Sequence, residues 1–138
     1  LRGSAETALE SAQQGASFVA ITTAVWPDAA FQAFAARHAD ALPLAVAVGA
    51  ASAKHAPLDA ALTAYLHAFA ANLVSAGVRL VPLGQTDGQK ALAALQPVVA
   101  EVVELALRTP LDEAGSAAPM VDWTSMRHET QYTRLFRS

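Results

Sequence analysis

The sequence contains no cysteine, which excludes a disulfide framework and any metal site built on thiolates. This absence fits a reducing compartment, and we expect a cytoplasmic protein. Charged residues are also scarce, at 15% of the 138 residues against roughly a quarter in ordinary soluble domains. Much of the surface is therefore expected to be apolar or occupied by a partner.

The chain also lacks an excess of basic charge. Nine lysines and arginines stand against twelve aspartates and glutamates, which gives a formal net charge of -3. DNA and RNA are bound by clustered cations, and the sequence has no such cluster. Nucleic acid is therefore not an expected partner.

Charge is absent altogether between Asp59 and Arg79, a length that touches the threshold for a membrane span. Alanine dominates this stretch, and Thr63, His67 and Asn72 interrupt it. Alanine contributes far less transfer free energy than leucine, so membrane insertion is not favoured. We expect a buried helix here and no membrane association.

The length suits one compact helical domain over residues 1–110, followed by a linker and partner-binding tail over residues 111–138. The sequence starts with Leu1 and Arg2 rather than methionine. We therefore expect a fragment or a processed chain, in which targeting signals at the natural start cannot be read.

Prolines and capping residues divide the chain into about five to six helices, which predicts an all-α bundle with a C-terminal tail. A first helix runs to the Trp26-Pro27 pair. Asp28 can cap a short second helix, Pro43 precedes a third, and Pro57 precedes a fourth. The third contains β-branched residues, but its alanines and glycine favour a helix over a strand.

The fourth helix carries two stripes with different roles. Large apolar residues on one stripe are expected to form core, and small residues on the other let a second helix approach closely. The first stripe comprises Leu58, Leu62, Tyr65, Leu66, Phe69 and Leu73, and the second comprises Ala60, Ala64, Ala68 and Ala71.

Residues 81–88 hold one proline and two glycines, which predicts a tight connection before a fifth helix. Thr86 and Gln89 have the spacing of a capping box at its start. Gly84 or Gly88 is expected to adopt a positive φ. Pro97 should kink or divide this helix, whose apolar seam comprises Leu92, Leu95, Val99, Val102 and Ala106.

No motif for catalysis appears in the sequence. There is no Gly-x-Ser-x-Gly turn, no P-loop and no His-Glu-x-x-His, so we predict no catalytic residue, no cofactor-binding residue and no metal ligand. His67 is interpreted as a structural helix histidine, and His38 and His55 are expected at solvent. The chain is predicted not to be an enzyme.

The tail combines aromatic residues with arginines, the types that dominate interface anchors. Trp123, Tyr132 and Phe136 alternate there with Arg127 and Arg134. Composition alone leaves two readings open, a partner-binding segment or a terminal helix docked on its own core.

Two stretches resemble the UreF family of urease accessory proteins. They are residues 72–89, NLVSAGVRLVPLGQTDGQ, and residues 125–138, SMRHETQYTRLFRS. Both correspond to the C-terminal part of that family, and its N-terminal part, with a Gly-Ser/Ala-Phe turn, has no counterpart here.

The resemblance implies an all-α, usually dimeric protein that performs no chemistry itself. Such a protein binds UreD (also called UreH), recruits the GTPase UreG and docks on apo-urease, so that nickel is handled by the complex without a cofactor on this chain. It influences GTPase activity and the fidelity of metal transfer. Two alternatives stay open, a metallochaperone that holds nickel through His67, His128 or carboxylates, and a helical scaffold unrelated to urease.

The resemblance also selects site residues. We expect the tail to be mobile in the free protein and ordered by UreD, with Arg134 as an anchor. For Arg79 and Gln85 two roles stay open, a structural one that ties the loop to a helix end and surface recognition of a partner. The expected partner-binding residues are Ser125, Met126, Arg127, His128, Glu129, Gln131, Tyr132, Arg134, Leu135 and Phe136, and the loop motif comprises Arg79, Pro82, Gly84, Gln85, Gly88 and Gln89.

Overall fold

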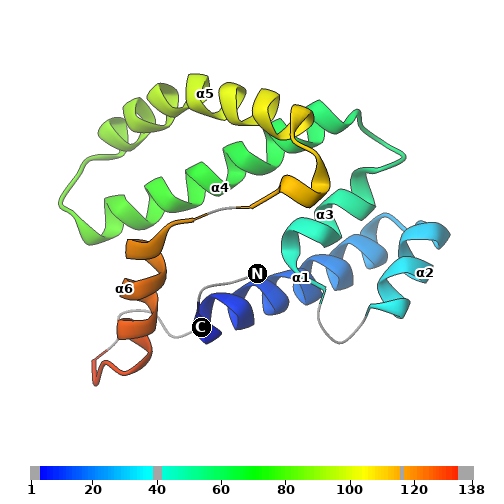
Figure 1. Ribbon diagram of the computed structural model, residues 1–138, viewed down its shortest axis with the longest axis horizontal. Helices are drawn as coiled ribbons and strands as arrows, with labels where there is room; N and C mark the ends of the chain where they lie inside the picture. The colour runs from blue at the N-terminus through cyan, green and yellow to red at the C-terminus, as the bar shows by residue number, and fades with distance from the viewer. Residues whose placement is uncertain (1–3, 39–41, 116, 134–138) are drawn as a thin grey trace. The chain divides into compact units, whose positions relative to one another are not determined.

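A computed structural model shows an all-α chain, as expected (Figure 1). The structure describes residues 4–38, 42–115 and 117–133. Within them lie six α-helices and one 3-10 helix, and no strand. Their bounds are α1 Ala5–Val25, α2 Ala29–Arg37, α3 Leu44–Ser52, α4 Leu58–Leu80, α5 Gln85–Arg108, η1 Leu111–Glu113 and α6 Pro119–Glu129.

The helices group into two compact units. Unit 1 comprises Leu1–Ala51 with Gly115–Ser138, and unit 2 comprises Ser52–Ala114. Helix α6 belongs to unit 1 because it packs against α1. The expected division into a domain over residues 1–110 and a linker with tail over 111–138 stays a prediction.

Side-chain caps fix the first two helices of unit 1. The Ser4 hydroxyl oxygen accepts a hydrogen bond from the Thr7 backbone N–H (3.2 Å), and Ser4 has the extended backbone of a cap. A carboxylate oxygen of Asp28 accepts from the backbone N–H of Phe31 (2.7 Å), which confirms the predicted cap of α2. Helix α1 ends at Val25, as the proline at position 27 predicted.

The core of unit 1 forms where the segment before α3 crosses α1. A Cβ atom on Gly15 would collide with the Leu42 carbonyl oxygen and lie 3.0 Å from the Leu44 nitrogen, so only glycine permits this approach. Leu42 is buried here and α3 is helical, as expected. The surrounding apolar residues are Phe18, Val19, Phe34, Ala35 and Ala47.

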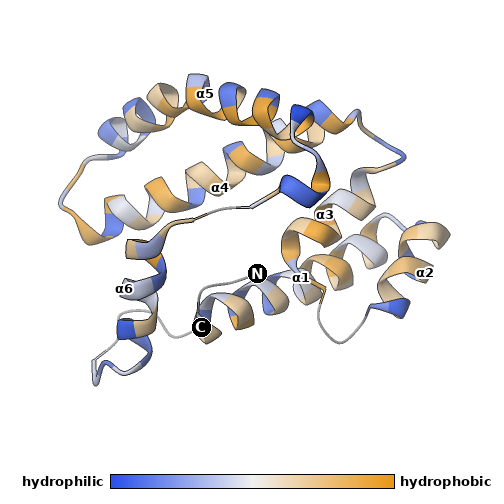
Figure 2. Ribbon diagram, in the orientation of Figure 1, coloured by the Kyte–Doolittle hydropathy of each residue, from blue (hydrophilic) through white to orange (hydrophobic). Residues whose placement is uncertain are grey.

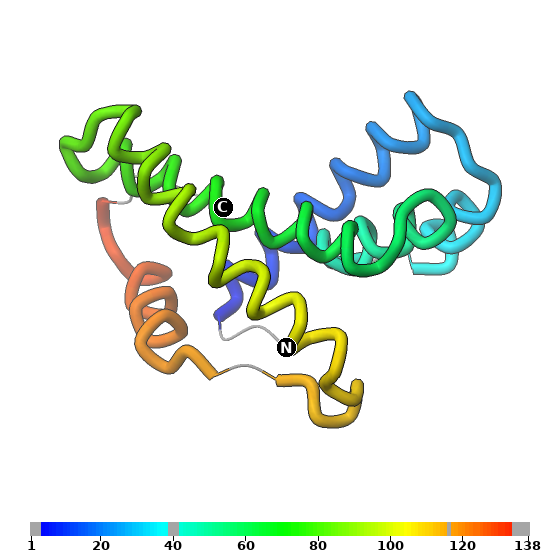
Figure 3. Tube along the Cα trace, turned by 90° about the horizontal axis from the view of Figure 1, so that it is seen from above, coloured from blue at the N-terminus to red at the C-terminus, as the bar shows by residue number. Residues whose placement is uncertain are grey.

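Unit 2 is built on the pair α4 and α5, which residues 81–84 join. The two helices are green and yellow in Figures 1 and 3. The predicted capping box at Thr86 and Gln89 is wrong, because α5 begins at Gln85 and its cap position is Gly84, without a side-chain cap bond. Thr86 lies inside the first turn. A hydroxyl in that position is past the point at which it could cap the helix.

The predicted positive φ of Gly84 or Gly88 is also wrong. Gly84 has φ of -73°, and none of the described glycines has a positive φ. Gly88 is required for packing instead. A Cβ there would lie 2.8 Å from Cγ2 of Val78 and 3.5 Å from Cγ1 of Val74, so α5 touches α4 closely at this point.

Helix α5 runs unbroken through Pro97, so the proline does not divide it, and Figure 1 shows the helix bowed. Its packed face differs slightly from the predicted seam, because Val103 is buried while Val102 is 41% exposed and Ala106 is exposed. On the outer side, Arg108 and Glu104 form the expected pair, with 4.0 Å between nitrogen and oxygen.

The expectation that α4 is a buried helix is wrong in this chain. Leu58, Phe69 and Leu73, predicted as core, are more than half exposed (65%, 53% and 59%), because α5 covers the neighbouring side around Ala70. Ala60, Ala64 and Ala68 of the alanine stripe are exposed and Ala71 is half-buried. By length and composition alone, α4 is the one helix among the described residues that could span a membrane. Figure 2 shows its apolar residues spread along it.

A candidate partner-binding surface on helix α6

Helix α6 lies within residues 111–138, which the sequence analysis predicted to be a linker and tail. Pro119 occupies its first turn, a position that proline favours, and the helix continues to Glu129. Sequence periodicity did not show this helix because the face that packs on α1 is polar. The residues from 125 to 129 are therefore part of a docked helix.

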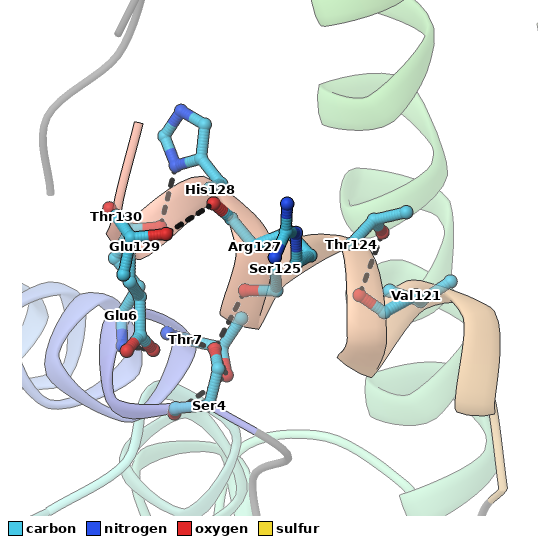
Figure 4. Close-up of polar contacts among 10 residues, drawn as sticks. All are labelled: Ser4, Glu6, Thr7, Val121, Thr124, Ser125, Arg127, His128, Glu129 and Thr130. Atoms are coloured by element: carbon cyan, nitrogen blue, oxygen red, sulfur yellow. Dashed lines mark hydrogen bonds and ion pairs between the residues drawn. The ribbon is translucent and has the colours of Figure 1, made fainter. Parts of the chain in front are cut away.

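The inner face of α6 meets the start of α1 through hydrogen bonds (Figure 4). The hydroxyl oxygens of Ser4 and Ser125 are 2.7 Å apart. Nδ1 of His128 is 2.7 Å from Oε2 of Glu6. The Glu6 backbone N–H donates to Oε1 of Glu129 (3.3 Å), so both ends of the chain share one polar contact.

These contacts suit the electrostatics of the two helix ends. The Glu129 carboxylate lies at the N-terminus of α1, where the helix dipole favours negative charge. His128 lies in the last turn of α6, where the dipole favours a proton donor or a cation. The Glu6 side chain is only 14% exposed and that of His128 is 32% exposed, which strengthens their interaction relative to a surface pair.

The outer face of α6 is apolar. Met120, Trp123 and Met126 recur every three residues, which places them on one side of the helix, and they are 68%, 56% and 48% exposed. Arg127 is exposed next to them. The side of α6 that packs on the protein is thus polar, with Ser125, His128 and Glu129, whereas large apolar residues are exposed to solvent. We call Met120, Trp123 and Met126 the outer face.

The structure separates the predicted partner-binding residues into two groups. Ser125, His128 and Glu129 point to α1, whereas Met126 and Arg127 are exposed. The reading as a docked helix therefore holds for the inner side of α6, and partner binding by its exposed residues stays a prediction.

The remaining predicted tail residues follow α6. Gln131 and Tyr132 are exposed, and Tyr132 is fully so. Arg134, Leu135 and Phe136 lie outside the described residues.

Sequence reasoning did not include Met120 and Trp123 among the site residues. It also missed Ser4 and Glu6 at the start of α1, which contact Ser125 and His128. The three-residue spacing of the outer face was the signal available for the first two. No local signal linked Ser4 and Glu6 to a segment more than a hundred residues away.

The loop motif lies in unit 2, apart from α6 in the grouping of the chain. Arg79 is in the last turn of α4, Pro82 in the connection and Gly84 at the cap of α5. Gln85 and Gln89 are exposed in the first turns of α5, where Gly88 is buried. The role proposed for Arg79 and Gln85 stays a prediction.

Histidines outside α6 are exposed, as expected for His38 and His55, and the ring of His38 lies 4.7 Å from that of Phe34. His67 is exposed as well. Among the described residues, no group of three or more histidine, aspartate or glutamate side chains could hold a metal ion.

Comparison with known proteins relates this chain to one family. The UreF family model matches residues 1–96, which include the first of the two stretches singled out above. A urease accessory protein UreF of Granulibacter bethesdensis is 59% identical over 138 residues, 99% of this chain and 58% of the relative. Proteins of the same name from Rhodopseudomonas palustris (strain BisB5) and a Bradyrhizobium species (strain ORS 278) are 51% and 48% identical over 136 residues, 98% of this chain and 56% of each relative.

The chain therefore spans somewhat more than half the length of these curated relatives. The matches with the relatives extend over nearly the whole chain, so they also cover α6 and the second stretch. With a family model over most of the chain and identities near half or above, this chain belongs to the UreF family.

Proposed function

We propose that this chain is part of a urease accessory protein that bridges UreD and the GTPase UreG to apo-urease for nickel insertion. In this proposal the protein modulates GTPase activity, forms a homodimer and works in the cytoplasm. It performs no chemical step itself. The relatives carry the printed name "urease accessory protein", and they match this chain from end to end at up to 59% identity.

The outer face of α6 is the observation that carries the proposal. A tryptophan and two methionines are held toward solvent by a helix whose polar side is anchored on α1. Tryptophan buries a large area at small entropic cost, and methionine adapts to varied partners. A rigidly presented apolar row with an arginine beside it suits a protein partner, and we assign UreD to it.

Trp123→Ala in the full-length protein tests this assignment. Loss of a tryptophan anchor should weaken UreD binding by about 2 kcal/mol, or roughly 30-fold in Kd. UreG should then be lost from the complex with UreD. Affinity for UreD is measured by titration, and recruitment of UreG by pull-down.

Thr124→Ala is the matched control, because Thr124 is an exposed neighbour whose hydroxyl bonds only to carbonyls of its own helix, those of Met120 and Val121. It should leave UreD binding unchanged. Both variants should melt like the unmodified protein. Unweakened UreD binding by Trp123→Ala would contradict the assignment.

Direct nickel binding is the competing function. Among the histidines suggested for it, His128 already contacts Glu6 and His67 is exposed without a described cluster of donors. We expect equilibrium dialysis to find no stoichiometric nickel on the isolated full-length protein. One tightly held nickel ion that is lost in His128→Ala would favour the metallochaperone instead.

A further inference from the structure

Unit 2 exposes a row of large apolar side chains on each of its two long helices. Their exposed fractions range from 41% to 65%, which is unusual for so many neighbouring residues in one helix pair. We call these residues the hairpin face. They are Leu58, Phe69, Leu73 and Leu80 on α4 and Val98, Val102 and Leu105 on α5.

The two rows lie on the same side of the pair. Phe69 directly precedes Ala70, which is buried, and Val102 directly precedes Val103, also buried. Consecutive residues are rotated by about 100° around a helix. In both helices the exposed residue comes one position before the buried one, so the exposed row is rotated from the packed row by the same angle in the same sense along the chain. Because α4 and α5 are antiparallel neighbours, equal rotation brings both exposed rows to one side. Both rows therefore contribute to an apolar face on one side of the helix pair.

The chain as a whole exposes more surface than it should for its size. Its accessible area is 10127 Å², whereas a compact protein of 14.3 kDa exposes about 6,800 Å². Even two separate compact bodies of half that mass would expose only about 8,200 Å² together. The exposed apolar side chains of unit 2 contribute to this excess.

Unit 1 also leaves apolar surface uncovered. An open groove of about 610 Å³ runs along α1 and α2, and its walls are mainly alanines with Val19 and Leu42. The groove is thus largely apolar, with Gln13, Thr23 and Gln32 as its polar members.

The comparison with the relatives indicates what covers the hairpin face. Their match covers 98–99% of this chain but only 56–58% of their own length, so about two-fifths of each relative has no counterpart here. We infer that polypeptide equivalent to this remaining length packs as helix over the hairpin face and completes the core of unit 2. The inference rests on family membership and not on the proposed binding of UreD or UreG.

A membrane is the less suitable occupant. Helix α5 carries Lys90, Glu101 and Glu104, and α4 is interrupted by His67 and Asn72. A protein helix can leave these polar groups at its margin, whereas a bilayer would have to bury or displace them.

The absence of cysteine makes the inference testable at single sites. The chain is placed in the Granulibacter bethesdensis relative in exchange for the matched 138 residues, with any cysteine of the added part replaced by serine. Leu73→Cys on the hairpin face is then labelled with a maleimide. The control is Glu104→Cys, on the opposite side of α5, where the native side chain is 74% exposed.

We expect Leu73→Cys to react at least tenfold more slowly than Glu104→Cys in this full-length chimera. A benzophenone maleimide attached at Leu73→Cys under denaturing conditions, followed by refolding and illumination, should crosslink to a peptide of the added part. Mass spectrometry identifies that peptide.

Four results would overturn the inference. They are equal labelling of the two cysteines, a crosslink within the 138 residues, a crosslink to a second copy that disappears on dilution, and protection that appears only with phosphatidylglycerol vesicles. Failure of UreD binding in the same chimera would bear on the proposed function alone, because the crosslink is measured without partners.

Discussion

The two units of this chain fix their helices in different ways. In unit 1, side chains of Ser4 and Asp28 cap the helices that follow them. In unit 2, the cap positions of α4 and α5 are Pro57 and Gly84, and neither helix has a side-chain cap bond. Unit 1 therefore has side-chain caps that the two long helices of unit 2 lack, and these helices depend more on packing.

The helix contacts differ in the same sense. Helices α1 and α6 meet through hydroxyls, carboxylates and an imidazole, whereas α4 and α5 meet through Gly88 and its valine neighbours, with Ala70 and Val103 buried. Polar contacts impose direction, and apolar contacts require complementary shape. Unit 2 is stabilised mainly by apolar contacts between complementary surfaces. The exposed hairpin face shows where unit 2 itself does not provide such contacts.

The largest expected effect is at Gly15. Gly15→Ala would drive Cβ into the Leu42 carbonyl oxygen, a backbone atom that cannot rotate away. We expect a loss of about 3 kcal/mol or more in the free energy of unfolding, measured by urea denaturation. Gly49→Ala is the control, since no atom lies within 4 Å of its Cβ position and the change should stabilise α3 by about 0.5 to 1 kcal/mol. Equal stability of the two variants would refute the close crossing.

A smaller loss is expected at Gly88 in unit 2. Its added Cβ would meet Cγ2 of Val78 at 2.8 Å, but a valine methyl can yield where a backbone atom cannot. Gly88→Ala should therefore cost about 1 kcal/mol after the gain in helix propensity. Gly77→Ala, with nothing within 4 Å, should instead be stabilising. The comparison by urea denaturation fails if Gly88→Ala is the more stable of the two.

The polar contact of unit 1 is next in size. We expect a double-mutant cycle with Glu6→Gln and His128→Ala to give a coupling of about 0.5 to 1 kcal/mol, because both side chains are only partly exposed. Thermal or urea unfolding provides the four stabilities. A coupling of zero would mean that the 2.7 Å contact is not maintained in solution.

Most of the fold could be read from sequence, and the failures have physical causes. Asp28 and Pro57 were visible because capping and proline act over one helical turn. The burial of α4 was misjudged because an apolar stripe indicates that a helix face is favoured to be buried. It does not indicate that another part of this chain packs against that face. The docking of α6 was missed because Glu6 and His128 are far apart in the sequence. Glutamate and histidine are also common on exposed surfaces, so neither residue by itself indicates a contact. A connection was expected over residues 81–88, and it is shorter, because α5 already begins at Gln85. The reason for Gly88 was missed because it depends on Val74 and Val78, which reach it only in the folded helix pair.

The smallest expected effect concerns Thr86, where the two ways of starting a helix can be compared directly. If Thr86 capped α5, Thr86→Ala would cost about 1 kcal/mol. It lies inside the first turn instead, after a cap position occupied by Gly84, so the substitution should change the unfolding free energy by less than about 0.3 kcal/mol. Asp28→Ala is the matched positive control, because its carboxylate accepts the Phe31 N–H at 2.7 Å and its loss should cost about 1 kcal/mol. Urea denaturation of the two variants side by side decides the matter, and a Thr86→Ala loss as large as that of Asp28→Ala would restore the capping box and shift the start of α5 to Asp87.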